Sequence, residues 1–111
     1  MKNEVLTIPH FDSRYKRFAK KFFSLENDVD NLIEKLLETP TIGESLGAGL
    51  YKIRLAVESK GGGKSGGFRV ISYLVNQSED GIDIYLLEIY DKSEESTIQK
   101  KELLKLVKAI L

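Results

Sequence analysis

The sequence predicts an α+β domain with the element order β-α-α-β-β-β-α, in which helices pack on one face of an antiparallel sheet. Apolar residues recur at helical spacing in the first third of the chain and again at its end. The segments between them either alternate apolar and polar residues or are continuously apolar, and both patterns are typical of strands. The length of 111 residues with 41% hydrophobic content fits one compact domain that spans residues 1–111.

The first part of the chain is predicted to form a short strand and an amphipathic helix. Residues 5–8 suit a strand, which Pro9 ends because proline lacks the backbone donor. A helix should follow, since four aromatic residues recur at helical spacing. They are Phe11, Tyr15, Phe18 and Phe22. Lysine and arginine lie between them, so the outer face is basic, and such a face either serves solubility or contacts phosphate groups.

A second helix is expected directly after the first, so that the two form a hairpin. Ser24 can cap its start, and it should stop at Thr39, because the residue before Pro40 is pushed out of the helical region. Its buried stripe consists of Leu25, Val29, Leu32, Ile33, Leu36 and Leu37. A loop through Gly43, Gly47 and Gly49 then leads to the middle of the chain.

Three further strands are predicted to form an antiparallel meander. From residue 51 onward apolar residues alternate with charged ones, so one face of this strand is apolar and the other is charged. Residues 68–75 are apolar on both faces, as expected of an interior strand, except for Arg69. A polar turn separates them from a third strand at residues 82–90.

A final helix is expected at the end of the chain. Ser96 and Gln99 have the spacing of a capping box, which would begin this helix. Its apolar stripe consists of Leu103, Leu106, Val107 and Ile110.

The loop between the first two strands of the meander is rich in glycine and lysine. Five of its residues from 61 to 67 are glycine, which disfavours a helix and allows positive φ angles. The chain as a whole has no net charge, with 17 basic and 17 acidic residues, yet the cations around this loop face Glu58 as their only acid. These cations are Lys52, Arg54, Lys60, Lys64 and Arg69. An anionic ligand would therefore meet a local basic patch.

Several common kinds of site are excluded or disfavoured. Without cysteine the chain has no disulfide and no cysteine zinc site. The glycines at 61, 63 and 66 match a dinucleotide-binding pattern, but a strand follows them instead of the required helix. Glu58 stands where a phosphate-binding P-loop requires glycine. His10, the only histidine, is interpreted as a surface residue, and no cluster of ligands supports a metal site.

The expected location is the cytoplasm. No run of about 18 apolar residues is present, and the first residues lack the apolar core of a signal peptide. We therefore expect a soluble protein that makes no membrane contact.

Basic and phenolic side chains are predicted to gather on three neighbouring strands. Tyr90 and Lys92 share a face because they are two residues apart. Together with the cations of the first two strands they could converge on one phosphate, or they could simply decorate an exposed sheet face. The candidates for this anion site are Arg54, Lys64, Arg69, Tyr90 and Lys92.

A family resemblance favours the first alternative. Residues 52–56, with the sequence KIRLA, the loop KGGGKSGG at 60–67 and the segment FRVI at 68–71 closely resemble the HigB-like branch of the RelE toxin family. The ending IYDKSE at 89–94 with its amphipathic final helix is also similar to that branch. The resemblance extends over roughly residues 5 to 110 and is strongest from 50 to 92.

The resemblance implies the toxin of a bacterial type II toxin–antitoxin pair, with a small α+β fold. Such a toxin is an endoribonuclease that cleaves messenger RNA in the A site of the 70S ribosome, without metal or cofactor, and inhibits translation. It also implies a cognate antitoxin, which we expect to be a small, HigA-like protein with a helix-turn-helix domain, encoded by a neighbouring gene.

The resemblance also assigns residues. The family's basic strand positions correspond to Lys52, Arg54 and Arg69, its loop lysine to Lys64, and its C-terminal basic position to Lys92. Some members carry a catalytic tyrosine near the final helix, where this chain has Ser96, Thr97 and Ile98. Tyr90 is then the candidate substitute.

The chemistry of RNA cleavage suits these residue types, because the 2′-hydroxyl of RNA is its own nucleophile. We expect Arg54 and Arg69 to stabilise the transition state and Lys64 and Lys92 to transfer protons or assist the leaving group. Glu58 is an alternative general base, and Tyr90 can stack on a base or orient a phosphate. The residues expected chiefly to bind RNA are Lys52, Lys60 and Tyr73.

Two other functions remain open from the sequence. A ParE-like relative would keep the fold but poison DNA gyrase without cutting RNA. A non-catalytic RNA-binding or ribosome-binding module would hold phosphates with the same basic strands and accelerate no reaction.

Overall fold

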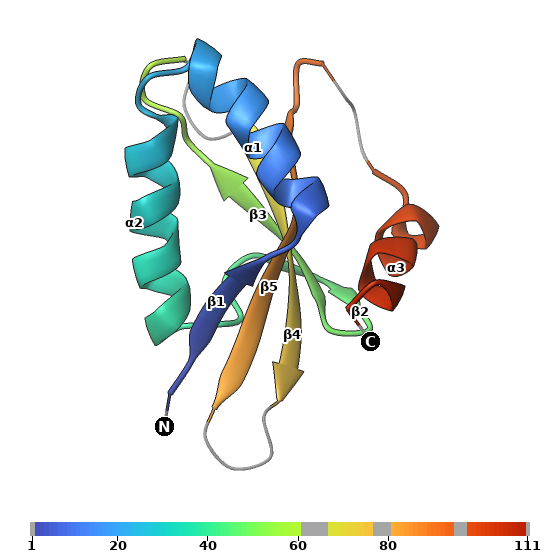
Figure 1. Ribbon diagram of the computed structural model, residues 1–111. Coiled ribbons are helices and arrows are strands. Elements are labelled where there is room, and N and C mark those ends of the chain that lie inside the picture. The colour runs from blue at the N-terminus through green and yellow to red at the C-terminus, as the bar shows by residue number, and fades with distance from the viewer. Residues whose placement is uncertain (1, 61–66, 77–80, 95–97, 111) are drawn as a thin grey trace.

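The structure, a computed structural model, describes residues 2–60, 67–76, 81–94 and 98–110 (Figure 1). The elements in chain order are β1 (Glu4–Thr7), α1 (Pro9–Lys21), α2 (Leu25–Glu38), β2 (Glu44–Gly47), β3 (Leu50–Leu55), β4 (Phe68–Asn76), β5 (Ile82–Asp91) and α3 (Lys100–Lys108). The predicted α+β order is confirmed, and the structure adds β2 before the meander. The strands form one sheet in the order β1-β5-β4-β3-β2.

The sheet is mixed, whereas the sequence predicted an antiparallel one. The pairs β2–β3, β3–β4 and β4–β5 are antiparallel, so the meander is confirmed. The pair β1–β5 is parallel, with Val5 opposite Ile84. Parallel neighbours need a long connection, and the segment between β1 and β5 provides it.

β2 lies where a loop was predicted. Its hairpin to β3 turns through Gly47, Ala48 and Gly49, whose φ angles are 82°, 55° and 82°. Glycine adopts such positive φ angles without steric cost, so the two glycines permit this tight hairpin. A Cβ atom on Gly49 would lie only 3.2 Å from the ring of Tyr73.

The helix boundaries follow the predicted signals with local differences. α1 begins at Pro9, which suits the first helical position, and α2 ends at Glu38, next to Thr39, as predicted. Ser24 precedes α2 but forms no side-chain cap, because its hydroxyl donates to Asp28 instead. α3 begins only after Gln99, and the predicted capping residue Ser96 lies outside the described residues.

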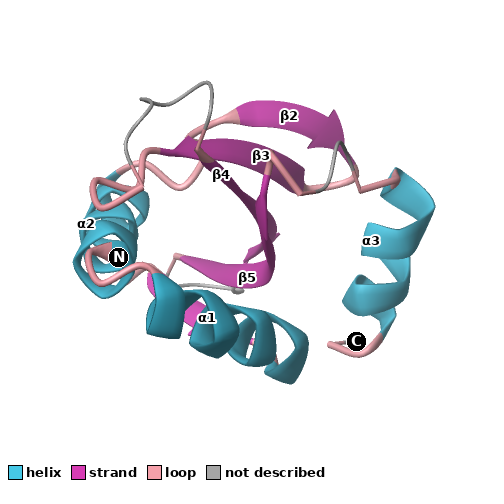
Figure 2. Ribbon diagram, turned by 90° about the horizontal axis from the view of Figure 1, so that it is seen from above, coloured by secondary structure: helices cyan, strands magenta, loops and turns pink. Residues whose placement is uncertain are grey.

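The helices cover both sides of the sheet. α2 and α3 lie on opposite sides, as the view from above shows (Figure 2), which corrects the prediction that the helices share one face. On the side of α1 and α2, the ring of Phe68 meets Phe18 and Phe22 edge-on, with centroid distances of 4.9 Å and 5.4 Å. Within the described residues no helix is long and apolar enough to cross a membrane.

Alternation along β4 distinguishes the two faces of the sheet. Phe68 points towards α1, so we call this side the α1 face. Arg69 is the next residue and therefore points to the opposite side, which we call the α3 face. The same alternation assigns the residues that pair with them on β3 and β5, because residues directly opposite each other share a face.

Candidate functional site

Three of the predicted site residues form a row across the sheet. Arg54 of β3 lies opposite Arg69 of β4, and Arg69 lies opposite Tyr90 of β5. Directly opposed residues of antiparallel strands project from the same side with Cβ atoms about 5 Å apart. The fold therefore brings two guanidinium groups and a phenol together on the α3 face, although they are up to 36 positions apart in the sequence.

Two further predicted cations flank this row. Lys52 precedes Arg54 by two residues on β3 and therefore projects from the same face. The backbone N–H of Lys92 donates to the carbonyl of Gly67 at 3.2 Å, which continues the β4–β5 ladder past the end of β5. Lys92 thus follows Tyr90 on the α3 face. Tyr73 shares this face of β4 but lies four residues from Arg69, near the opposite end of the strand.

The row combines exposed and buried groups. Arg54 is exposed, and its guanidinium makes no hydrogen bond or ion pair with any other described residue. Arg69 is only 4% exposed, and its Nη1 donates to the carbonyl of Phe68 at 3.1 Å. Like charges directly opposite each other repel. A phosphate bound at the exposed Arg54 would also meet the positive charge of Arg69 beside it, and both charges would attract it.

Burial contradicts one predicted role of Tyr90. The residue is 1% exposed, so no RNA base can stack on its ring in this structure. The prediction treated this end of β5 as surface, whereas the strand is buried from residue 86 to residue 91. What remains open for Tyr90 is a contact through its hydroxyl group.

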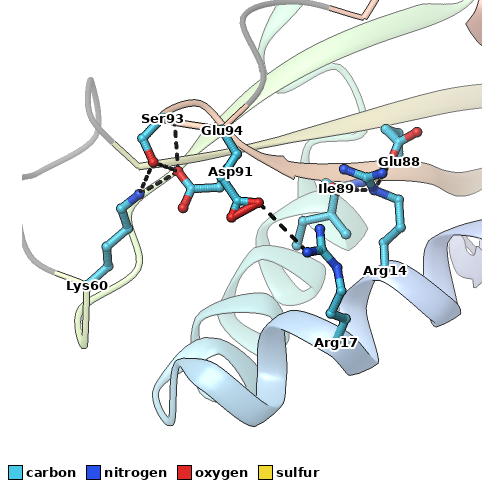
Figure 3. Close-up of polar contacts among 8 residues, drawn as sticks. All are labelled: Arg14, Arg17, Lys60, Glu88, Ile89, Asp91, Ser93 and Glu94. Carbon is cyan, nitrogen blue, oxygen red and sulfur yellow. Dashed lines mark hydrogen bonds and ion pairs between the residues drawn. The ribbon is translucent and has the colours of Figure 1, made fainter.

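Lys60 does not belong to this row. Its Nζ forms an ion pair with Asp91 and donates to Ser93 Oγ at 3.1 Å (Figure 3). Asp91 lies opposite Phe68 and so projects from the α1 face, away from Arg69. The Lys60 ammonium also lies 5.6 Å from the centre of the Phe68 ring. The structure thus gives the Lys60 ammonium a buried carboxylate as its partner, and the RNA-binding role of Lys60 stays a prediction.

The environment of Asp91 changes the pKa of its carboxyl group. Burial by itself raises the pKa, because it penalises the charged form. Hydrogen bonds from Lys60 and Ser93, together with the ammonium charge, outweigh this effect and hold the pKa below its usual value of 3.8. The folded state therefore binds the Asp91 proton more weakly than the unfolded state does. The ion pair stabilises the fold at pH values above 3.8, and this stabilisation is lost as the pH falls through the lowered pKa of the folded state.

The lowered pKa of Asp91 predicts how the stability of the protein depends on pH. Asp91→Asn should lower the free energy of unfolding near neutral pH, and the difference from wild type should shrink as the pH falls below 3.8. Urea unfolding over a series of pH values measures this difference. Glu94→Gln serves as the control, because the Glu94 side chain is 39% exposed and lies 3.8 Å from Arg17. Parallel stability curves for wild type and Asp91→Asn would contradict the assignment.

Two predicted residues remain, Lys64 and Glu58. Lys64 lies outside the described residues, so its predicted role stays a prediction. Glu58 is exposed in the turn after β3, and its backbone N–H donates to Asp28 Oδ2 at 3.1 Å. The described residues show no ion pair of the Glu58 carboxylate with Arg54 or Arg69, so its role as a general base also remains a prediction.

The sequence interpretation missed a second charged cluster, between α1 and β5. Glu88 is 4% exposed, and its carboxylate lies 2.5 Å from His10 Nε2 and 2.6 Å from Arg14 Nε. Arg14 Nε also donates to the carbonyl of Ile89 at 2.9 Å (Figure 3). β1 pairs only with residues 83–86 of β5. Beyond this paired region, side chains of α1 contact β5 in place of β1. The sequence signal for this cluster was Glu88 itself, because it is the only glutamate in the otherwise largely apolar strand β5.

Metal ligation finds no support among the side chains that the structure describes. Within that part of the chain, no three histidine, aspartate or glutamate residues are grouped so that they could hold a metal ion. The described side chains of the row on the α3 face are those of two arginines and a tyrosine, with Lys52 and Lys92 beside them.

The chain matches a protein-family model over most of its length. The family model described as the RelE toxin of the RelE/RelB toxin–antitoxin system matches residues 11–110. The matched range includes the Arg54–Arg69–Tyr90 row, both flanking lysines and all three helices except the first residues of α1.

Proposed function

We propose that this chain, which belongs to the RelE toxin family of toxin–antitoxin systems, cleaves messenger RNA in the A site of the ribosome and thereby stops translation. The observation that supports this activity is the row of Arg54, Arg69 and Tyr90 across three strands, flanked by Lys52 and Lys92. The proposed substrate would place the protein in the cytoplasm. Its partner would be an antitoxin with a helix-turn-helix domain, encoded by the adjacent gene.

The proposed reaction uses the 2′-hydroxyl of the RNA as the nucleophile. This oxygen attacks the adjacent phosphorus, the bond to the 5′-oxygen breaks, and the products carry a 2′,3′-cyclic phosphate and a 5′-hydroxyl. Negative charge accumulates on the phosphate oxygens in the transition state. Arg54 and Arg69 would stabilise this charge, since a guanidinium can hold two phosphate oxygens at once.

Proton transfer is assigned to the lysines of the site. Lys92 is exposed at the end of the row and would donate to, or stabilise, the leaving 5′-oxygen. Lys64 is the proposed partner for the proton of the 2′-hydroxyl, with Glu58 as the alternative base. Lys52 and Tyr73 would bind flanking RNA, and the Tyr90 hydroxyl would orient the scissile phosphate.

Ribosomes paused on a defined message provide the direct test. Purified protein should create new RNA ends at the A-site codon, with 5′-hydroxyl groups, and only when ribosomes are present. Intact RNA despite tight binding to ribosomes would favour a non-catalytic module instead. DNA breaks that depend on gyrase, without mRNA cleavage, would favour a ParE-like poison. Either result would overturn the proposed activity.

Substitutions of the two flanking lysines should affect different kinetic constants, one for RNA binding and one for the cleavage step. Lys52→Ala should raise KM several-fold with a small change in kcat, because a phosphate contact is made equally in the ground state and the transition state. Lys92→Ala should lower kcat by about 10²-fold to 10⁴-fold, the usual contribution of a positioned acid or base. Steady-state cleavage of A-site mRNA measures both constants, and equal effects on kcat from the two variants would contradict this division.

A further inference from the structure

The carboxylate of Asp91 accepts three hydrogen bonds where β5 ends. Lys60 Nζ donates to Asp91 Oδ1, and Ser93 donates to the same atom from its backbone N–H at 2.9 Å and from its hydroxyl at 2.7 Å. The Ser93 hydroxyl in turn accepts from Lys60 Nζ at 3.1 Å (Figure 3). The Asp91 side chain is 3% exposed and the Lys60 side chain 17%, so water competes little for these bonds.

These bonds fix a turn that contains Lys92. The Asp91 side chain accepts from the N–H of Ser93, and the Asp91 carbonyl accepts from the N–H of Glu94 at 2.9 Å. Both bonds span Lys92, so they restrict the backbone dihedral angles on either side of its Cα atom. The N–H of Lys92 is also bonded, to the carbonyl of Gly67 at 3.2 Å. The turn at residues 91–94 therefore sets the direction in which the Lys92 side chain leaves the backbone.

The ion pair that supports this turn lies on the opposite face of the sheet from the row. Asp91 lies opposite Phe68 and projects from the α1 face, whereas Lys92, the next residue, projects from the α3 face. The Lys60 ammonium lies 5.6 Å and 6.0 Å from the ring centres of Phe68 and Phe22, so it is packed between the sheet and the end of α1. From this side, the ion pair is connected to the row through the backbone of Lys92.

The Lys60 ammonium allows the Asp91 carboxylate to remain buried in its charged form. A carboxylate taken out of water loses its hydration, and a paired charge with further hydrogen bonds is needed to offset that cost. Without the ammonium, the carboxylate would turn towards water or bind a proton. Its hydrogen bonds with Ser93 would weaken in either case, and the turn would no longer hold one conformation.

We propose that Lys60 and Asp91 are positioning residues, which hold Lys92 in the direction that proton transfer to the leaving 5′-oxygen requires. A proton donor must come within hydrogen-bond reach of its target, and a displacement of about 1 Å can slow a reaction about 10²-fold. The inference rests on the proposed function, because positioning matters only if Lys92 takes part in cleavage. It gives Lys60 a part in the cleavage step that differs from binding of RNA.

Two substitutions of Lys60 test the positioning role. Lys60→Met keeps the apolar stem beside the two rings but removes the charge, so kcat for A-site mRNA should fall about tenfold or more with KM unchanged. Lys60→Arg keeps a cation beside Asp91 and should recover most of the rate. A raised KM at unchanged kcat would show that Lys60 binds RNA. Either this result or a wild-type rate for Lys60→Met would overturn the proposal.

The same substitution in a chain without Lys92 distinguishes positioning from a structural role. A residue that acts through Lys92 has nothing to position in the Lys92→Ala background, so adding Lys60→Met should there change the single-turnover rate by less than about twofold. Asp91→Ala should follow the same pattern. If Lys60→Met lowers the rate by the same factor in both backgrounds, it acts independently of Lys92 and the proposal fails.

Arg14→Ala is the control for loss of stability. It breaks another buried ion pair of β5, the one with Glu88, and is remote from the turn at residues 91–94. It should leave kcat within about threefold of wild type at a temperature where unfolding midpoints show that every variant is folded. If Arg14→Ala slows cleavage as much as Lys60→Met does, a general loosening of β5 explains both effects and the proposal fails.

Amide hydrogen exchange tests the turn without a cleavage assay. The Ser93 amide donates to Asp91 Oδ1 and should exchange about tenfold or more faster in Lys60→Met than in wild type, while the Val70 amide within β4 should not change. Unchanged exchange at Ser93 would overturn the proposal. If the wild-type protein cleaves no mRNA, the proposed function itself fails. If wild type and Lys60→Met cleave equally fast, only the positioning role fails.

Discussion

Replacing Arg54 with alanine should lower the rate of mRNA cleavage by about a hundredfold and leave the stability of the protein unchanged. Loss of one preorganised contact to charge in the transition state typically costs 10²-fold to 10³-fold in kcat. Arg54 is exposed and has no ion pair or hydrogen bond with a described residue, so its removal breaks no structural contact. Single-turnover cleavage on saturated ribosomes and urea unfolding measure the two quantities.

Two further variants distinguish the loss of a specific catalytic contact from a general loss of positive charge. Lys105→Ala removes one positive charge from α3, where the Lys105 side chain is 71% exposed, and should leave cleavage unchanged. Arg69→Ala should slow cleavage as strongly as Arg54→Ala but should also lower stability, because Arg69 is buried. Cleavage within about threefold of wild type for either arginine variant would contradict the proposed site, given the usual size of such a contact.

Replacing Arg14 with alanine should destabilise the fold by about 3 kcal/mol, which is the lower end of the range for breaking a buried ion pair. The Glu88 carboxylate has a side-chain exposure of only 5%, so it would lose its guanidinium partner in a poorly solvated place, where His10 Nε2 remains within 2.5 Å. The hydrogen bond from Arg14 to the carbonyl of Ile89 would also be lost. The difference in the free energy of unfolding between wild type and variant measures this effect.

Arg17→Ala provides a matched control on the same helix. Arg17 lies 3.8 Å from Glu94, and the two side chains are 58% and 39% exposed. Exposed ion pairs contribute roughly 0 to 1 kcal/mol, so this variant should lose little stability. Equal destabilisation by the two substitutions would show that burial of Glu88 does not set the strength of its ion pair.

The elements that could be predicted are those whose signals lie within a few neighbouring residues. The aromatic residues at helical spacing identified α1, and Pro40 marked the end of α2 correctly. The alternation after residue 51 identified β3, and from it followed that Lys52 and Arg54 share a face. These signals are local because helix and strand periodicities are properties of one segment.

What the sequence did not reveal are contacts between distant segments. Lys60 was assigned to RNA because its sequence neighbours are glycines and lysines, whereas its partner Asp91 comes from the far end of β5. Tyr90 was treated as surface, although packing buries it. β2 was missed because Gly47 and Gly49 are loop signals by themselves and become hairpin residues only when β3 lies alongside.

The sequence by itself determined the order of all helices and strands except β2, the family resemblance and the concentration of cations around β3 and β4. Only the tertiary structure decided that Arg54, Arg69 and Tyr90 share one row and that Lys60 serves an ion pair on the opposite face. The physical reason is that periodicity constrains the direction of a side chain within its own segment. Its partner and its exposure depend on the register and packing of segments that are far apart in the chain.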